Sequence, residues 1–378
     1  MARLLFVRVD SSRSIGAGHV MRCLAIAQKF NQLQVDVVFI SRPNLGDQLT
    51  VLRAAGFAVI ELPVANQYQA DWCAHAGWLG ASREDDAAAT IAAIKQYSQA
   101  ESHWLLVDHF AIDAKWHRLV KKATQAKIIV IDGLGDRALE CDVLVDTTLR
   151  PNGENFWRAK LPLASKIFLG PQQVLLRDEF YGNEALNGAR QVEAKQSGYR
   201  ILIAFGGSDA DNATGISLAA LLDAAQQVSI EVQIDIVVGA AYPFWQELKQ
   251  KVASADNIRL HRQISNVATL MRQADLAIGA GGTMAWERIA LRLPSIVIAI
   301  AENQLEQAAQ LAERNCIFYL GELGALGHEQ LTLRVSEVLS APNLWGQQQE
   351  QMRDLMPALA TPAWFEHVIR TMATTTDD

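Results

Sequence analysis

Short runs of apolar, often β-branched residues alternate along this chain with longer segments whose apolar residues recur at helical spacing. In the first half, the runs that predict strands are residues 4–9, 35–40, 58–62, 104–108, 128–131 and 143–145. Helices are predicted between them, over about residues 18–30, 44–55, 84–99 and 113–125. Continuous apolar strands separated by helices are typical of a parallel sheet covered on both faces.

A polar stretch without strong periodicity, residues 182–198, interrupts this alternation and predicts a linker between two domains. The alternation then resumes with predicted strands at residues 201–205, 232–238, 258–260, 276–278, 296–300 and 317–320. Helices are predicted over about residues 211–226, 243–253, 265–273, 283–291, 304–314 and 328–340.

The whole pattern predicts an α/β protein of two Rossmann-like domains with parallel sheets facing a central cleft. The domains are expected at residues 1–181 and 199–360. A last helix, residues 362–372, is expected to pack back on the first domain, and the polar tail 374–378 is expected to fray.

Composition narrows the class of protein. The 41 acidic residues outnumber the 34 lysines and arginines, and the net charge of −7 argues against nucleic acid or a membrane surface as a partner. No apolar stretch reaches membrane-spanning length, and the first residues are not typical of a secretory signal, so a soluble cytoplasmic protein is expected. The four cysteines are scattered without metal or redox spacing, which favours buried thiols in a reducing compartment.

A glycine turn, Ser-Ile-Gly-Ala-Gly-His, directly follows the first predicted strand and ends at His19. It is not a dinucleotide fingerprint, because the third glycine is missing and no acidic residue closes the second strand. The turn places His19 in the first turn of a helix, where the helix dipole disfavours the imidazolium and so favours a general base. Gly18 leaves space beside the ring. The alternative is a histidine that caps the helix or fills a gap.

Polar residues also follow other strands at the carboxyl edge, where ligands bind in such sheets. Asp10 could orient His19 or hold Arg13, or it could simply form an Asp-Ser-Ser turn. Asp108 could line the cleft or fix its own loop. Asp113 is expected to cap the helix that follows it.

A second glycine turn, Gly-Ala-Gly-Gly-Thr, follows the strand predicted at 276–278. Gly281 and Gly282 let the backbone approach a phosphate closely, and Thr283 adds a hydroxyl donor. Glu287 lies one helical turn further, where its carboxylate could accept both ribose hydroxyls. The alternative is an ion pair with Arg288 or Arg292.

Three further segments lie at the same predicted edge. Gly207 and Ser208 could donate to phosphates or sugar, or form an ordinary strand-to-helix turn. The neutral amides of Asn303 and Gln304 suit a polyhydroxylated or acetamido ligand, unless Asn303 caps a helix. Backbone groups around Ile264 could read uracil.

Together these motifs resemble the UDP-2,4-diacetamido-2,4,6-trideoxy-β-L-altropyranose hydrolases of pseudaminic acid biosynthesis. The resemblance starts with Arg-Val-Asp-Ser-Ser at residues 8–12 and Gly-Ala-Gly-His-Val-Met-Arg at 16–22. It continues in order through residues 108–110, 141–144, 176–180, 206–209, 281–287 and 303–304. The family is similar to the lipid II-forming N-acetylglucosaminyltransferase and shares its glycosyltransferase B architecture.

The resemblance implies that UDP binds the second domain, with Glu287 on the ribose, and that the sugar faces His19 with Asn303 close to the reacting carbon. Water would attack C1 and displace UDP, without a metal or a cofactor, and a monomer is expected. The substrate-binding residues it implies are Asp10, Arg13, Gly18, Asp108, Phe110, Gly207, Ser208, Ile264, Gly281, Gly282, Thr283, Glu287 and Gln304.

One position departs from the family. Phe110 stands where the family usually carries tyrosine, so any part that a phenol hydroxyl plays in holding water or sugar is lost.

Two other functions fit the same domains: a glycosyltransferase that needs an acceptor, and a binding module for nucleotide sugars without catalysis. A non-hydrolysing UDP-sugar epimerase has less support from the motifs.

Overall fold

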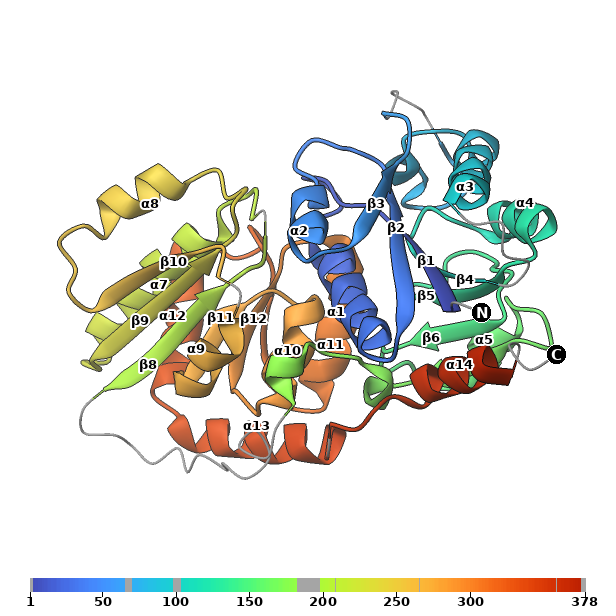
Figure 1. Ribbon diagram of the computed structural model, residues 1–378. Helices are drawn as coiled ribbons and strands as arrows, with labels where there is room; N and C mark the ends of the chain where they lie inside the picture. Colours follow the sequence, from blue (N-terminus) through green and yellow to red (C-terminus); the bar gives the residue numbers. More distant parts are fainter. Residues whose placement is uncertain are drawn as a thin grey trace. The chain divides into compact units, whose positions relative to one another are not determined.

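The computed structural model describes residues 3–64, 70–97, 103–181, 198–207, 209–264, 266–357 and 359–374. The chain forms two compact units (Figure 1). The first unit comprises residues 1–175 and 360–378, and the second comprises residues 176–359. The predicted linker, apart from Gly198, and the tail after Thr374 lie outside the described residues.

The first unit contains a seven-stranded sheet in the order β3-β2-β1-β4-β5-β6-β7. All neighbouring strands pair in parallel. The strands are β1 (Arg3–Val9), β2 (Val35–Ser41), β3 (Ala58–Glu61), β4 (Trp104–Asp108), β5 (Lys127–Ile131), β6 (Val143–Asp146) and β7 (Lys166–Leu169).

Alternation along β1 explains why helices cover both faces of this sheet. Leu5, Val7 and Val9 enter one apolar core, whereas Phe6 enters the other. Helices α1 (Gly18–Gln32), α2 (Leu49–Ala54) and α14 (Ala363–Thr374) contribute to the first core. Helices α3 (Arg83–Tyr97), α4 (Ala114–Thr124) and α5 (Gly153–Arg158) contribute to the second.

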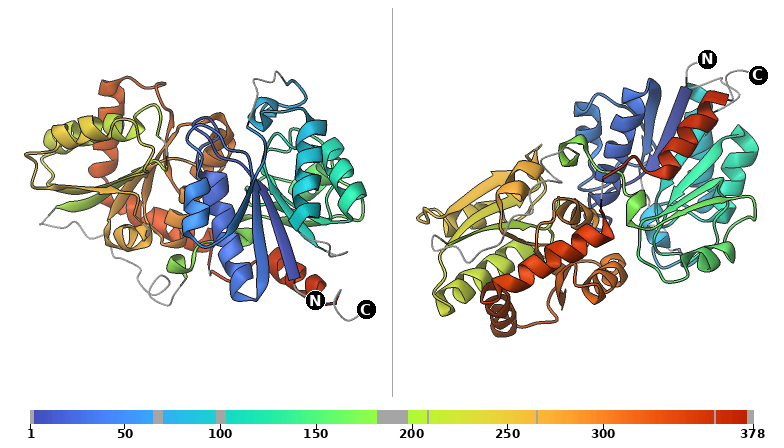
Figure 2. Two further views of the ribbon diagram at one scale, coloured as in Figure 1. Left: turned by 45° about the horizontal axis from the view of Figure 1, so that its top comes forward. Right: turned by 90° about the horizontal axis from the view of Figure 1, so that it is seen from below.

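Helix α14 belongs to the first unit although it ends the chain (Figure 2). Its buried Phe365 packs 4.5 Å from the ring of Phe30 in α1, measured between centroids. The indole of Trp364 donates a hydrogen bond to the carbonyl oxygen of Gln173. These contacts anchor the last helix to the core of the first sheet.

The second unit contains a six-stranded parallel sheet in the order β10-β9-β8-β11-β12-β13. The strands are β8 (Tyr199–Ala204), β9 (Val232–Val238), β10 (Ile258–Arg262), β11 (Leu276–Gly279), β12 (Ser295–Ala299) and β13 (Phe318–Glu322). The helices are α7 (Ala213–Gln227), α8 (Trp245–Lys251), α9 (Val267–Gln273), α10 (Thr283–Ala290), α11 (Leu305–Glu313), α12 (His328–Leu339) and α13 (Pro342–Leu355).

The core of the second unit lies between its sheet and helices α7, α8, α12 and α13. Trp345 of α13 is fully buried there, 4.7 Å from the ring of Tyr199. Helices α9, α10 and α11 contact β8, β11 and β12. The two parallel-sheet α/β units confirm the predicted fold class, while the facing of their sheets across a cleft stays a prediction.

Short 3-10 helices complete the described elements. They are Ala76–Leu79, Pro171–Gln173, Asp178–Phe180 and Glu302–Gln304. No helix among the described residues combines the length and apolarity needed to cross a bilayer.

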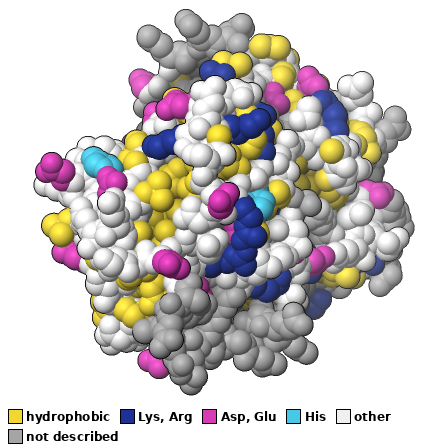
Figure 3. Space-filling model, turned by 90° about the vertical axis from the view of Figure 1, so that its left-hand side faces the viewer, with side chains coloured by type: hydrophobic (Ala, Val, Ile, Leu, Met, Phe, Trp, Pro, Cys, Tyr) yellow, Lys and Arg dark blue, Asp and Glu magenta, His cyan; other side chains and the backbone are white. Residues whose placement is uncertain are grey.

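On the face in Figure 3, acidic and basic side chains are interspersed, with hydrophobic side chains between them.

Candidate functional site

The order of the first sheet identifies where its ligand edge lies. The chain leaves β1 toward one side of the sheet, and β4 lies on the other side, so the two strands flank the topological switch point. Val9 at the end of β1 pairs with Asp108 at the end of β4. His19 is the second residue of α1, the helix that follows β1. The fold therefore brings His19 and Asp108 to the same edge.

The two side chains form a buried hydrogen-bonded pair. Nδ1 of His19 lies 2.6 Å from Oδ1 of Asp108, and the two residues are 6% and 0% exposed. Because a carboxylate accepts, Nδ1 of His19 carries the proton and donates it, which leaves Nε2 as the free ring nitrogen. This arrangement matches the base and orienting group of nucleophile-activating sites.

Asp108 is held in its ionised form by its other neighbours. Arg22 donates to both carboxylate oxygens, at 2.8 Å from Nε and 2.7 Å from Nη2. The thiol of Cys23 donates to Oδ2 at 3.5 Å. Burial alone would raise the pKa of the Asp108 carboxyl, but the charges and hydrogen bonds of Arg22 and His19 hold this pKa well below its usual range.

Aromatic rings surround the imidazole of His19. Phe110 meets it edge-on at 4.6 Å between ring centroids, and Trp78 lies at 6.2 Å. His75 packs against Trp78 at 4.3 Å. Phe110 is buried and carries no hydroxyl, so it restrains the ring of His19 through packing rather than through a hydrogen bond.

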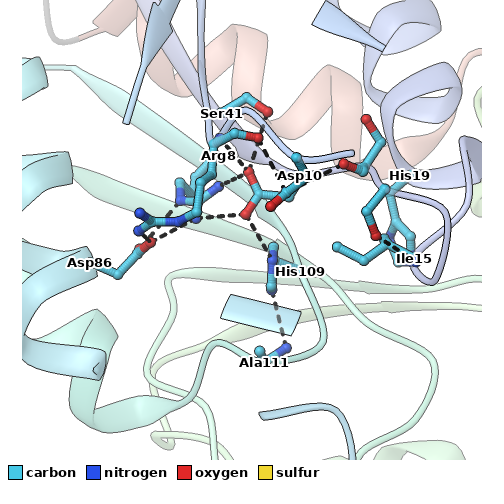
Figure 4. Close-up of polar contacts among 12 residues, drawn as sticks. Arg8, Asp10, Ile15, His19, Ser41, Asp86, His109 and Ala111 are labelled. Atoms are coloured by element: carbon cyan, nitrogen blue, oxygen red, sulfur yellow. Dashed lines mark hydrogen bonds and ion pairs between the residues drawn. The ribbon is translucent and has the colours of Figure 1, made fainter. Parts of the chain in front are cut away.

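Asp10 does not orient His19. Its carboxylate accepts from Arg8, at 2.5 Å from Nη1 and 2.8 Å from Nη2, and from the backbone N–H of Arg42 at 2.7 Å (Figure 4). Nε2 of His109 lies 3.1 Å from its other oxygen. Asp10 is fully buried, and these partners engage both of its oxygens, so its contacts in the structure are with the protein, and direct contact with substrate stays a prediction. The physical reason that it does not orient His19 is Arg8, two residues earlier on the same face of β1, which neutralises the carboxylate.

His109 is a neutral member of this buried network. The backbone N–H of Ala111 donates to Nδ1 of His109 at 3.2 Å, so Nε2 is the protonated nitrogen that donates to Asp10. Burial lowers the pKa of His109 against the opposing effect of Asp10. Arg13 and Gly18 are exposed beside the network, and the backbone N–H of Arg13 donates to the carbonyl of Leu45.

In the second unit, β8 and β11 flank the switch point, and each runs through a glycine turn into a helix. After β8, the carboxylate of Asp209 accepts from the backbone N–H groups of Ala213 and Thr214, at 2.7 and 2.9 Å. The start of α7 is thus already occupied by an acidic side chain, which opposes the expected phosphate contact. The backbone of Gly207 lies against Gly239, and Ser208 lies outside the described residues.

The start of α10, after β11, differs because no described side chain caps it. Its N-cap residue is Gly282, and Thr283 begins the helix with a half-buried side chain. The backbone N–H of Gly281, however, donates to Oε1 of Gln304 at 3.2 Å. An anion at this turn would therefore meet the donors of the first helical turn rather than that of Gly281.

Gln304 holds this turn from the loop after β12. Its Oε1 also accepts from the backbone N–H of Ile300 at 3.2 Å. Gln307 supports the same turn by donating to the carbonyl of Gly281 at 2.7 Å. The amide oxygen of Gln304 thus accepts from two backbone groups of the protein, and contact between its amide and a ligand stays a prediction.

Glu287 is 6% exposed, and its two oxygens are in different situations. Oε1 accepts from Nη2 of Arg177 at 3.0 Å, whereas Oε2 has no hydrogen-bond partner among the described residues. Burial raises the pKa of this carboxyl, against the opposing charge of Arg177. The ion pair that Glu287 forms is with Arg177 rather than with Arg288 or Arg292, and the charge of Arg288 also lowers the pKa of this carboxyl.

Arg177 and Arg22 are functional candidates that had no assigned role in the sequence. Arg177 also pairs with Glu179 at 2.7 Å, within the Leu-Arg-Asp-Glu-Phe run. Arg22 stands three residues after His19, on the same face of α1. The position of Arg177 in that run and the helical spacing of Arg22 from His19 are the features of the sequence that could have identified them.

Asn303 and Ile264 lie at the same edge of the second sheet. Asn303 is half-buried in the 3-10 helix Glu302–Gln304, and α11 starts without a side-chain cap, so the predicted alternative of capping is wrong. Ile264 follows β10 and is half-buried. Because β10 is three strands from β11, Ile264 lies roughly 14 Å from the glycine turn across the sheet.

Comparison with known proteins places this geometry in context. Residues 200–354 match the glycosyltransferase family 28 C-terminal domain. The chain is 24% identical to the UDP-2,4-diacetamido-2,4,6-trideoxy-beta-L-altropyranose hydrolase of Campylobacter jejuni, over 82% of this chain and 97% of that enzyme. It is 26% identical to the spore coat polysaccharide biosynthesis protein SpsG of Bacillus subtilis, over 63% of this chain and 67% of that protein.

A third relative is the uncharacterized protein MJ1062 of Methanocaldococcus jannaschii, 25% identical over 79% of this chain. This chain spans just over half of that relative, 55% of its length. Among solved structures, the spinosyn rhamnosyltransferase SpnG with thymidine diphosphate has a TM-score of 0.62 at 18% identity, covering 97% of this chain and all of SpnG. MurG of Acinetobacter baumannii has a TM-score of 0.59 at 14% identity, covering 98% of this chain and 99% of MurG.

These structures share the glycosyltransferase B fold with this chain. Taken with the sequence relatives, they support a function in nucleotide-sugar chemistry.

Proposed function

We propose, on the premise that this chain is homologous to a UDP-sugar hydrolase and carries a glycosyltransferase family 28 C-terminal domain, that it hydrolyses a UDP-linked diacetamido-trideoxy sugar. The products are UDP and the free sugar, as in pseudaminic acid biosynthesis. The single observation that carries the proposal is the buried His19–Asp108 pair at the ligand edge of the first sheet, with a distance of 2.6 Å between Nδ1 and Oδ1.

In the proposed reaction, Nε2 of His19 accepts a proton from water while the water oxygen bonds to C1 of the sugar. The bond between C1 and the diphosphate oxygen breaks, and its electron pair leaves with UDP. Asp108 stabilises the imidazolium that forms, and Arg22 keeps Asp108 ionised. A positioned base of this kind typically contributes about 10²–10⁴-fold to the rate.

The second unit would bind the UDP. The first turn of α10, with Thr283 at its start, would meet the diphosphate and stabilise the charge that develops as it leaves. Oε2 of Glu287 would accept from a ribose hydroxyl, which would satisfy a buried oxygen that has no hydrogen-bond partner among the described residues. Backbone groups near Ile264 would read the uracil.

The sugar would lie near His19, with Asn303 contributing an amide to its acetamido or hydroxyl groups. Phe110, with its neighbour Trp78, offers an apolar surface beside the imidazole. Such a surface suits the methyl and acetyl groups of a diacetamido-trideoxy sugar better than it suits a fully hydroxylated sugar.

The decisive experiment is incubation of the purified protein with this UDP-sugar, without any acceptor. Release of UDP together with free sugar supports the proposal. A folded sample that binds UDP but releases none from the UDP-sugar contradicts it.

A glycosyltransferase is the second candidate, favoured by the family 28 match and by the fold of SpnG and MurG. In that case the same base would deprotonate a hydroxyl of an acceptor instead of water. UDP release would then depend on the acceptor and rise with its concentration, which separates the two functions in one assay.

A further inference from the structure

Arg288 lies directly behind the glycine turn of the second unit. It is the sixth residue of α10, and it is 1% exposed. Its Nη2 donates to the carbonyl oxygen of Ala280 at 2.6 Å. A Cβ atom built on Gly279 would come within 2.8 Å of Nη1, so the guanidinium occupies the space that a side chain at Gly279 would need.

The guanidinium is buried and forms no ion pair with a carboxylate among the described residues, although the charge of Glu287 acts on it. Nε and Nη1 have no hydrogen-bond partner among the described residues. The adjacent Glu287 directs its engaged oxygen to Arg177 instead. Burial lowers the pKa of Arg288 to about 10 against the opposing charge of Glu287, which reflects the cost of keeping this charge away from water.

Arg288 and Gln304 together fix the peptide between Ala280 and Gly281. The carbonyl of this peptide accepts from Arg288, and its N–H donates to Gln304. The peptide is therefore held from both sides, immediately before the uncapped start of α10. A neutral side chain could also donate a hydrogen bond to this carbonyl. The hydrogen bond alone therefore does not explain why a charged residue stands here.

We propose that Arg288 is the built-in counter-charge for an anionic ligand, of the nucleoside diphosphate class, at the start of α10. The turn separates the guanidinium from the ligand, so Arg288 is a positioning residue that acts through the backbone and through its field. The charge of Glu287 offsets the charge of Arg288 only in part, and a bound diphosphate would supply further negative charge. The inference rests on the proposed function, because that function supplies the diphosphate.

The test measures two quantities in the full chain: affinity for UDP and for uridine by calorimetry, and stability without ligand by urea unfolding. Arg288→Met removes the charge and keeps much of the side-chain volume. We expect it to weaken UDP binding roughly tenfold or more, since a charge acting across one layer of backbone is only partly screened. Uridine binding should stay unchanged, and the urea midpoint should change little, because removal of a buried charge offsets the loss of the hydrogen bond to the Ala280 carbonyl.

Arg288→Lys, which keeps the charge, should retain UDP affinity within a few-fold. Arg292→Met removes the same charge four residues later, beyond the end of α10 at Ala290, and serves as the matched control, with UDP affinity expected to stay within twofold. Should Arg288→Met fail to fold, Arg288→Gln against Arg288→Lys makes the same comparison, with loss of UDP affinity expected in the glutamine variant alone.

Two outcomes with the Arg288→Met variant overturn the inference. One is UDP affinity within twofold of wild type in Arg288→Met. The other is an equal loss for UDP and uridine together with a lower urea midpoint, which would make Arg288 a structural residue only. These readouts are independent of turnover: a wild-type protein that binds UDP but never hydrolyses a UDP-sugar refutes the proposed hydrolysis alone. A wild-type protein that does not bind UDP refutes both.

Discussion

Nδ1 of His19 lies 2.6 Å from Oδ1 of Asp108, although 89 residues separate the two along the chain. One residue comes from the helix after β1 and the other from the end of β4, and these strands are neighbours in the sheet. The pair fixes both the orientation of the imidazole and the nitrogen that remains free. Any chemistry at this edge that needs a base would use Nε2 of His19.

Asp108→Asn should reduce kcat for UDP-sugar hydrolysis about 10²–10⁴-fold and leave UDP affinity unchanged. The amide keeps the shape of the side chain but removes the negative charge that stabilises the imidazolium. The measurement is steady-state kinetics with UDP affinity from calorimetry. Asp113→Asn, at a carboxylate that caps α4 and does not contact His19, is the matched control. Full turnover by Asp108→Asn would refute the assigned role.

Glu287→Gln should weaken UDP binding roughly 10- to 100-fold, the range for loss of a charge-assisted hydrogen bond. Wild type should prefer UDP over 2′-deoxy-UDP, and the variant should largely lose this preference, because Oε2 is proposed to accept from ribose. Calorimetry with both nucleotides checks this. Glu247→Gln, on the exposed side of α8, should behave as wild type. An unchanged preference in Glu287→Gln would place the ribose elsewhere.

Gln304→Glu keeps the hydrogen bonds that this side chain forms with the glycine turn and adds a negative charge, so it tests the two effects separately. The carboxylate can still accept from the N–H groups of Gly281 and Ile300, so the unfolding midpoint should stay close to that of wild type. A negative charge beside the start of α10 should nevertheless weaken UDP binding, by roughly tenfold.

Gln304→Ala should lower both quantities, since it leaves two backbone donors without their acceptor, at a cost of about 1–3 kcal/mol for each one that stays unsatisfied. Thermal unfolding and calorimetry on the two variants make the comparison. Tight UDP binding by Gln304→Glu would show that no anion binds at this turn.

His117 should make the stability of the first unit depend on pH. It is fully buried, and burial lowers its pKa from 6.5 to about 3. The folded protein therefore keeps His117 neutral while the unfolded chain binds a proton below about pH 6.5. Stability from this group is present above pH 6.5 and is lost as the pH falls, by about 2 kcal/mol between pH 7.5 and pH 5.

His117→Gln removes this titration and keeps an acceptor for the backbone N–H of Glu140. The loss of stability between pH 7.5 and pH 5, measured by urea unfolding, should be about 2 kcal/mol smaller in this variant than in wild type. His328→Gln, at an exposed histidine that pairs with Asp223, is the control. Equal pH dependence in His117→Gln and wild type would refute this explanation.

Much of the fold follows from the sequence pattern, because long buried strands and amphipathic helices leave clear periodicity. β7 was missed because it has only four residues, begins with Lys166 and is half-exposed at the edge of the sheet. α5 was missed because its six residues cover less than two helical turns. In both cases tertiary contacts, not local periodicity, determine the element.

The sequence predicted which strand ends carry the candidate site, but it did not predict which side chains form hydrogen bonds and ion pairs with one another there. The sequence placed Asp10 and Asp108 at the same edge and offered Asp10 as the possible partner of His19, whereas the structure pairs His19 with Asp108. In the structure, Arg8 binds Asp10 and so holds its carboxylate away from His19. The spacing of residues in the sequence does not predict the direction of these side chains. The partner of Glu287 was likewise hidden, because Arg177 lies 110 residues earlier in the chain.

The most direct test of the proposed water attack uses the UDP-sugar in oxygen-18 water, followed by mass spectrometry of the released UDP. Attack at C1 breaks the bond between carbon and oxygen, so UDP should carry no label. UDP should be released without an acceptor, and His19→Gln should release it about 10²–10⁴-fold more slowly. UDP that carries the label, or release that requires an acceptor or proceeds at full rate in His19→Gln, would contradict the account.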